Sequence, residues 1–260
     1  MDAEIGVIGG TGLYSILDNG EEKAFKTKYG NPSSPIKMGE FGKKKIAFIS
    51  RHGKDHTIPP HKVPYRANIA ALASLGVKKV IGSNASGSLN GDYKPGDIVF
   101  FDQYVNMTHG RDDTFFDGPG VVHLSAPDPY CKSLRKLFID QADELGLDYH
   151  RGGTIVIVNG PRFSTRAESK LFVAQGFDAI SMTAYPEVCL AREKQMCYLG
   201  IGTITDYDNG LEGRDDIKPV TFNEIKRVFD KNARNVKKLI LTAIPLIEKD
   251  QKSCDCGKML

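Results

Sequence analysis

The chain has 260 residues, of which 40% are hydrophobic and 26% are charged, and its net charge is +3. This is the composition of a globular protein, and it excludes a disordered, collagen-like or coiled-coil chain. No apolar run approaches the roughly 20 residues that span a bilayer, and the acidic start has no signal-peptide pattern. The small charge and the absence of a basic stripe argue against nucleic-acid binding. We therefore expect a cytoplasmic protein with neither a membrane nor a nucleic-acid partner.

Short β-branched runs alternate along the chain with segments of helical periodicity. Strands are predicted at residues 5–8, 46–49, 80–81, 98–101, 154–158, 179–180 and 198–203. Helices are predicted at 64–75, at 128–145 with Asp128 as N-cap and Pro129 next, at 166–175, and from the Thr221/Glu224 capping box onwards. This order predicts an α/β fold: a single domain over residues 1–250, with a central mixed, largely parallel sheet flanked by helices, followed by a tail, 251–260.

Ligands in such folds bind beyond the carboxyl ends of the strands, so the residues there matter most. Gly9-Gly10-Thr11-Gly12 follows the first strand and offers backbone amides to an anion. A tight structural turn is the alternative, because the third glycine of a dinucleotide loop and the lysine of a P-loop are missing. Arg51 and His52 follow the second strand. They could bind an oxyanion, with Arg51 as a bidentate fork, or lie in a solvated loop.

The later strand ends carry hydroxyls, amides and carboxylates. Residues 83–88 are a run of small donors without a nucleophile-elbow motif, and Ser181-Met182-Thr183 follows a later strand. The last strand leads into Asp206 and Asp208. This carboxylate pair suits recognition of a base, with a metal site or a solvated turn as alternatives. A metal site of His52, His56 and His61 is not favoured by their spacing.

Five cysteines, Cys131, Cys189, Cys197, Cys254 and Cys256, are an odd number for a secreted disulfide framework. We expect mostly buried, reduced thiols. The Cys-x-Cys pair lacks the usual zinc-ligand spacing, and no second pair lies near it in sequence. Redox or disulfide chemistry at the tail is the remaining alternative.

Several motifs together resemble the 5′-methylthioadenosine phosphorylases, within the trimeric purine nucleoside phosphorylase family. They span about residues 5 to 245 and comprise residues 8–13, 51–57, 85–89, 95–99, 159–164, 166–168, 182–183 with 186–187, and 205–208. The runs Gly-Pro-Arg-Phe (160–163) and Thr-Asp-Tyr-Asp (205–208) are the most specific of them.

The resemblance implies phosphate-dependent cleavage of the N-glycosidic bond of methylthioadenosine, which gives adenine and 5-methylthioribose 1-phosphate. Such an enzyme is a pentosyltransferase of purine and methionine salvage. The resemblance also implies inorganic phosphate as co-substrate and neither a metal nor another cofactor. The implied assembly is a homotrimer or a homohexamer made of two trimers.

The resemblance also assigns roles to residues of this chain. Phosphate would be held by Thr11, Arg51, His52, Asn84, Ala85 and Thr183, where Asn84 replaces a common threonine and would contribute only its backbone. The nucleoside would contact Phe163, Ser164, Met182, Phe222, Ile225 and, from a neighbouring subunit, His123. Asp206 would be the general acid at N7 of adenine, and Asp206 and Asp208 would accept from its 6-amino group.

Other substrates and other functions are also compatible with these residues. Relatives that use 6-oxopurine nucleosides carry asparagine at the position matching Asp206, but a protonated Asp206 could still donate to methylthioinosine. The segment 209–219, which should cover the site, matches the family poorly, and the tail resembles archaeal members with disulfides. From other classes, the glycine loop alone suggests a nicotinamide-dependent dehydrogenase, and a nucleoside-binding or nucleic-acid-binding protein is the non-enzymatic alternative.

Overall fold

The computed structural model describes residues 2–10, 12–14, 16–17, 20–211, 222–248 and 254–258, with the backbone alone for 222–226. Within these ranges no helix is both long enough and apolar enough to cross a membrane.

The described strands form one eleven-stranded sheet. They are β1 (Ile5–Gly9), β2 (Glu21–Lys23), β3 (Ile36–Phe41), β4 (Lys44–Ser50), β5 (Lys79–Ser88), β6 (Ile98–Phe100), β7 (Gln103–Met107), β8 (Tyr149–His150), β9 (Thr154–Val158), β10 (Ala179–Ser181) and β11 (Cys197–Tyr207). Their order is β2-β3-β4-β1-β5-β10-β9-β7, while β11 pairs with β5 and β6, and β6 with β8. β5 runs parallel to β1 and β11 but antiparallel to β10. The predicted mixed, largely parallel sheet is confirmed.

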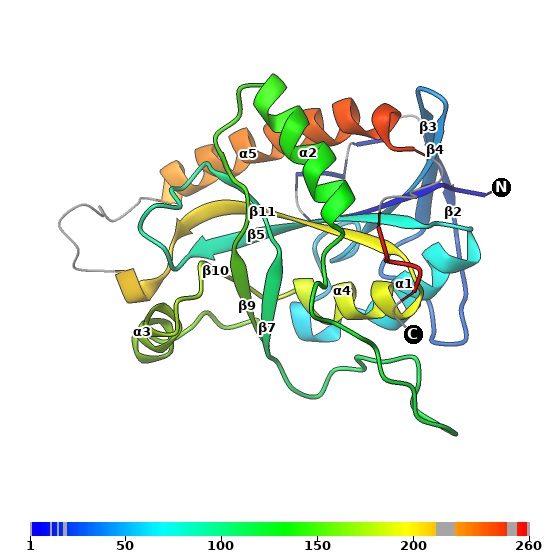
Figure 1. Cartoon of the computed structure of the whole chain (residues 1–260), viewed down its shortest axis with the longest axis horizontal. Helices are drawn as coiled ribbons and strands as arrows, with labels where there is room; N and C mark the ends of the chain where they lie inside the picture. The colour runs from blue at the N-terminus through cyan, green and yellow to red at the C-terminus, as the bar shows by residue number, and fades with distance from the viewer. Residues whose placement is uncertain are drawn as a thin grey trace.

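Helices cover both faces of the sheet, as the alternating pattern predicts. They are α1 (Tyr65–Ser74), α2 (Lys132–Glu144), α3 (Arg166–Ala174), α4 (Ala184–Glu193) and α5 (Phe222–Ala243), with 3₁₀ turns at Pro60–Lys62, Asn209–Leu211 and Ile244–Leu246. α2 and α5 pack together on one face, and α1 and α4 on the other (Figure 1). Each pair closes its own apolar core against the sheet.

One helix start was predicted wrongly. α2 begins at Lys132 with Cys131 as its N-cap, three residues later than the Pro129 start that the sequence predicted. The Cys131 amide donates to the carbonyl oxygen of Tyr198 at 2.8 Å, which keeps this residue extended against β11. Asp128 instead forms an exposed ion pair with Lys132 at 2.8 Å.

The two central strands are longer than their apolar runs. β5 continues through Ser88 and β11 through Tyr207, because the two strands keep pairing with each other beyond residues 84 and 203. The polar residues predicted to lie in loops after these strands therefore belong to the strands themselves, where the pairing of β5 with β11 fixes their positions.

A buried ion pair joins β4, α4 and β11. The Nε and Nη2 atoms of Arg51 each donate to a carboxylate oxygen of Glu187 at 2.8 Å, and the two side chains are 1% and 0% exposed. The Tyr198 hydroxyl donates to the same carboxylate at 2.6 Å. Burial raises the pKa of Tyr198 well above its usual value, so this phenol remains a donor. The end of β4 is thus held against α4 and β11, which lie far along the chain, around one carboxylate.

Gly82 on β5 is required beside this ion pair. A Cβ atom at this position would lie 2.0 Å from the Tyr198 hydroxyl oxygen and 2.9 Å from Oε1 of Glu187. Any side chain there would displace one of the two partners.

We expect Glu187→Gln to lower the free energy of unfolding by about 3 kcal/mol or more, because it leaves a buried arginine charge without its counter-ion. Urea unfolding measures this change. The control is Asp128→Asn, which breaks an exposed ion pair and should cost less than about 1 kcal/mol. Equal, small effects of the two substitutions would contradict the importance of the buried pair.

Candidate active site

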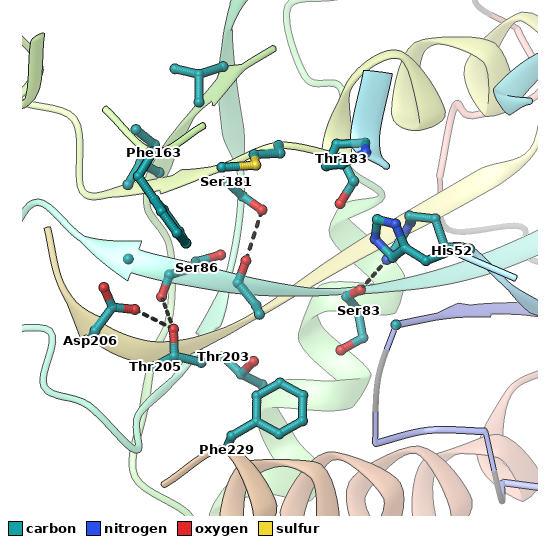
Figure 2. A pocket seen from close by; sticks show the side chains of 18 of the residues that line it. His52, Ser83, Ser86, Phe163, Ser181, Thr183, Thr203, Thr205, Asp206 and Phe229 are labelled. Atoms are coloured by element: carbon teal, nitrogen blue, oxygen red, sulfur yellow. Dashed lines mark hydrogen bonds between the residues drawn. The ribbon is translucent and has the colours of Figure 1, made fainter. Parts of the chain in front are cut away.

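A cavity of about 730 Å³ opens at the carboxyl ends of the central strands. β5 and β11 form its floor, the residues that follow β4, β9 and β10 form its sides, and α5 closes one wall (Figure 2). Its polar lining residues divide between two ends: His52 and Thr183 lie at one, and Asp206 lies at the other. This is the predicted location for a ligand of an α/β sheet.

Hydroxyl and imidazole groups line the first end. The Asn84 side-chain amide donates to Oγ1 of Thr183 at 2.7 Å, so the Thr183 hydroxyl hydrogen points elsewhere and is available to the cavity. Asn84 itself is not among the residues that line the cavity.

The prediction that Arg51 offers a bidentate fork to an oxyanion was wrong. Glu187 occupies the fork, and Nη1 of Arg51 also donates to the carbonyl oxygen of Ser83 at 2.7 Å. Nη2 makes a further bond to the carbonyl oxygen of Ile8 at 3.3 Å. Among the described residues this leaves one Nη1 hydrogen for a ligand. Arg51 therefore contributes positive charge and a single donor at this end.

A β-bulge in β11 determines which side chains line the opposite end of the cavity. The register between β5 and β11 shifts between Ile204 and Asp206, so that Thr205 is the extra residue. Without the bulge, neighbouring side chains would face opposite sides of the sheet. With it, Thr203, Thr205, Asp206 and Asp208 all line the cavity.

The two carboxylates in this wall are largely buried. Burial raises the pKa of Asp206; the hydrogen bond from Thr205 at 2.5 Å opposes this shift, and the nearby Asp208 adds to it. Asp208 is 7% exposed. A buried carboxyl with a raised pKa is suited to hold and donate a proton.

Helix α5 supplies an apolar wall. Phe229, Ala233 and Val236 face the cavity with helical spacing. Gly12 allows this helix to approach closely: its φ is +98°, and a Cβ atom there would lie 2.6 Å from Cβ of Ala233. The glycine loop thus serves helix packing as well as the cavity.

The structure brings most of the predicted site residues together. Those that line the cavity are Arg51, His52, Ala85, Phe163, Ser164, Met182, Thr183, Asp206 and Asp208. Phe163 is 77% exposed, at the mouth. His123 lies outside the cavity, on an exposed part of the segment between β7 and α2 that extends away from the sheet (Figure 1). Thr11 and the side chains of Phe222 and Ile225 lie outside the described residues.

Sequence reasoning assigned no individual role to two residues at the site, Ser86 and Arg111. Ser86 lines the cavity, and its buried hydroxyl has no hydrogen-bond partner in the described part of the chain. Arg111 lies behind the cavity and donates to the carbonyl oxygens of Met182 at 2.8 Å and Asn159 at 2.9 Å, and also to that of Tyr185. Ser86 belongs to the run of small donors, which was the signal for it. The arginine has no local signal, because its partners lie far along the chain.

The cysteines are less scattered than the sequence indicates. The Sγ atoms of Cys131, Cys197, Cys254 and Cys256 all lie within 4.8 Å of one another, on the face of the sheet that carries α2. The fold therefore supplies the neighbours that the tail pair lacks in sequence. Cys189 lies on α4, outside this cluster.

Comparison with known proteins agrees with this architecture. Residues 4–245 match the family model described as the phosphorylase superfamily. The S-methyl-5′-thioadenosine phosphorylase of Thermofilum pendens is 52% identical, over 99% of this chain and 97% of that protein. The corresponding protein of Pyrococcus abyssi is 50% identical, with the same two coverages.

Solved structures agree as well. A methylthioadenosine phosphorylase from an antarctic soil metagenomic library has a TM-score of 0.92 and 37% identity, covering all of this chain and 91% of its own. The Schistosoma mansoni methylthioadenosine phosphorylase in complex with adenine has a TM-score of 0.89 and 33% identity, covering 96% of this chain and 93% of its own. The chain belongs to the phosphorylase superfamily and, within it, to the family of the methylthioadenosine phosphorylases.

Proposed function

We propose that this protein cleaves 5′-methylthioadenosine with inorganic phosphate, giving adenine and 5-methylthioribose 1-phosphate. The observation that carries the proposal is the two-ended cavity: hydroxyl, imidazole and guanidinium groups at one end, and two buried carboxylates at the other. A phosphorolytic enzyme must hold an anion and a purine on opposite sides of one ribose. Relatives that share about half of this sequence carry the name of this activity.

At the anion end, the protein positions phosphate as the nucleophile. The Thr183 hydroxyl and the remaining Nη1 hydrogen of Arg51 donate to phosphate oxygens, with His52 beside them. As the C1′–N9 bond breaks, positive charge develops on the ribose, and the adjacent phosphate stabilises it before attacking C1′. Holding a separate nucleophile in this way supplies about 7–11 kcal/mol in favourable cases.

At the other end, Asp206 promotes departure of the base. Burial raises its pKa, which favours the protonated carboxyl that donates to N7 and neutralises the charge that develops on the purine. General acid catalysis of this kind contributes about 10²–10⁴-fold. Asp208 accepts a hydrogen bond from the 6-amino group, which favours adenine over a 6-oxopurine.

The apolar wall suits the methylthio group. Phe229 and Ala233 follow position 225 at intervals of one and two helical turns, so the predicted contacts at Phe222 and Ile225 would continue the same stripe. An apolar wall favours a thioether over the hydroxyl of an ordinary nucleoside.

A second substrate class follows from the protonation state of Asp206. A carboxyl that keeps its proton can donate to the 6-oxo group of methylthioinosine or another 6-oxopurine nucleoside. The two substrates place opposite demands on Asp206, so comparing them tests the assignment.

We also propose that the working enzyme is a homotrimer or homohexamer in the cytoplasm, acting in purine and methionine salvage without a metal or an organic cofactor. The segment that carries His123 supports an assembly. It projects from the sheet with Val121 80% exposed and Val122 42% exposed. In an assembly, this segment could reach a neighbouring subunit's cavity.

The cysteine cluster supports a further proposal, that its thiols form disulfides. The Sγ atoms of Cys197 and Cys254 lie 3.5 Å apart. Hydrogen bonds from Cys131 and Cys197, with Arg192 nearby, lower the pKa of Cys256, which favours the nucleophilic thiolate. Each bond requires the loss of two protons and two electrons to an oxidant such as dioxygen or a disulfide donor.

We expect Asp206→Asn to lower kcat/KM for methylthioadenosine at least about tenfold, with a relative gain on inosine. Because folding raises the pKa of Asp206, the free energy of unfolding of the wild-type protein falls as the pH rises through that pKa. Asparagine does not ionise, so the variant should be no less stable than the wild type at neutral pH. Kinetics with both substrates and thermal unfolding measure these effects. Asp140→Asn, on the exposed face of α2, is the control. Unchanged kinetics would remove Asp206 from the mechanism.

Sedimentation velocity of the active protein should show a trimer or a hexamer. An active monomer would contradict both the assembly and the role of His123.

Alkylation of the unfolded, unreduced protein should modify fewer than all five cysteines. Cys189, which lies outside the cluster, should react and serves as the internal control. Modification of all five would contradict disulfides, and metal released in the same experiment would identify the cluster as a metal site instead.

A further inference from the structure

His52 has a fixed tautomer. Its Nδ1 atom lies 2.9 Å from the carbonyl oxygen of Ile58, and a carbonyl oxygen only accepts, so Nδ1 carries the hydrogen. The Ile58 amide donates back to the carbonyl oxygen of His52 at 3.0 Å, which closes the loop between them. In the neutral ring, the other nitrogen, Nε2, therefore has a lone pair and no hydrogen.

The surroundings keep this ring neutral. Burial lowers the pKa of His52 to about 4, and the neighbouring Arg51 and His56 act in the same direction. The rings of His52 and His56 have centroids 4.7 Å apart. Lys54 and Asp55, on the same loop, are exposed to solvent.

Among the described residues that line the cavity, no carboxylate lies at this end. Glu187, which approaches from α4, is committed to Arg51 and Tyr198. Asp206 lies at the opposite end of the cavity, as Figure 2 shows, and Asp208 lines the cavity from the same strand end. The ring is therefore an acceptor at the end of the cavity that also holds the Thr183 hydroxyl.

An acceptor in an anion site creates a conflict. A fully deprotonated phosphate oxygen and the Nε2 lone pair would face each other as two acceptors, which repel. One proton between them turns this repulsion into a charge-assisted hydrogen bond.

We infer that phosphate binds with one proton shared between a phosphate oxygen and Nε2 of His52, so that the species taken from solution is the monoanion. This inference rests on the proposed function. The proton comes with the monoanion or, where the dianion predominates, from solvent, and no covalent bond changes in the binding step. Thr183 and Arg51 then donate to the remaining oxygens.

The test is calorimetric titration of the wild-type protein with inorganic phosphate over a range of pH. The Kd should stay constant where the monoanion predominates and rise about tenfold per pH unit above the second pKa of phosphate. In two buffers with different ionisation enthalpies, alkaline titrations should show uptake of one proton per phosphate. Affinity that increases as the dianion forms, with no proton uptake, would overturn the inference.

Sulfate is the matched probe, because it stays a dianion throughout and brings no proton. Its Kd should rise about tenfold per pH unit over the whole range above the pKa of His52. Parallel curves for sulfate and phosphate below the second pKa of phosphate would contradict a proton carried in by phosphate.

Two variants separate His52 from other groups. The substitution His52→Gln places an amide donor near the position of Nε2, so proton uptake should disappear even if affinity falls. Asp206→Asn, at the far end of the cavity, should leave the proton count unchanged; a changed count would assign the proton to Asp206 instead. Phosphorolysis without proton uptake would overturn this inference alone, whereas absence of both phosphate binding and phosphorolysis would overturn the proposed function.

Discussion

The buried pair between Arg51 and Glu187 is the constraint on which the anion end of the site depends. It joins the end of β4 to α4, and Tyr198 adds β11 through the same carboxylate. Removing such charges from water is costly, and only precise partners offset that cost. The pair fixes the backbone from which His52 projects and leaves one guanidinium hydrogen for a ligand. Positive charge is thus placed at the cavity without the flexibility of an exposed arginine.

The β-bulge at Thr205 determines the geometry of the other end of the cavity, as the buried ion pair does at the anion end. A regular strand would alternate its side chains across the sheet, whereas the extra residue lets Thr205 and Asp206 both face the cavity. The hydroxyl then orients the carboxyl, and burial raises its pKa. The chemistry proposed for the purine therefore depends on an irregularity in the ladder between β5 and β11.

The sequence predicts the sheet and the strand ends well, because parallel strands have continuous apolar runs and their carboxyl ends collect ligands. It predicts poorly what depends on distant partners. Glu187 lies 136 residues from the arginine that it holds, so Arg51 looked available for an anion. Cys131 and Cys256 meet only after folding. The bulge depends on the pairing of two strands, and the residue types at positions 204–206 do not predict it. Short or exposed strands such as β7 lack an apolar run and were missed.

We propose that one cavity joins phosphate to the glycosidic carbon of methylthioadenosine. The most direct test is to incubate the purified protein with methylthioadenosine, with and without inorganic phosphate, and to follow free adenine and the sugar product. We expect adenine release that requires phosphate and yields 5-methylthioribose 1-phosphate in equal amount. Adenine release at the same rate without phosphate, with free methylthioribose as the product, would contradict it.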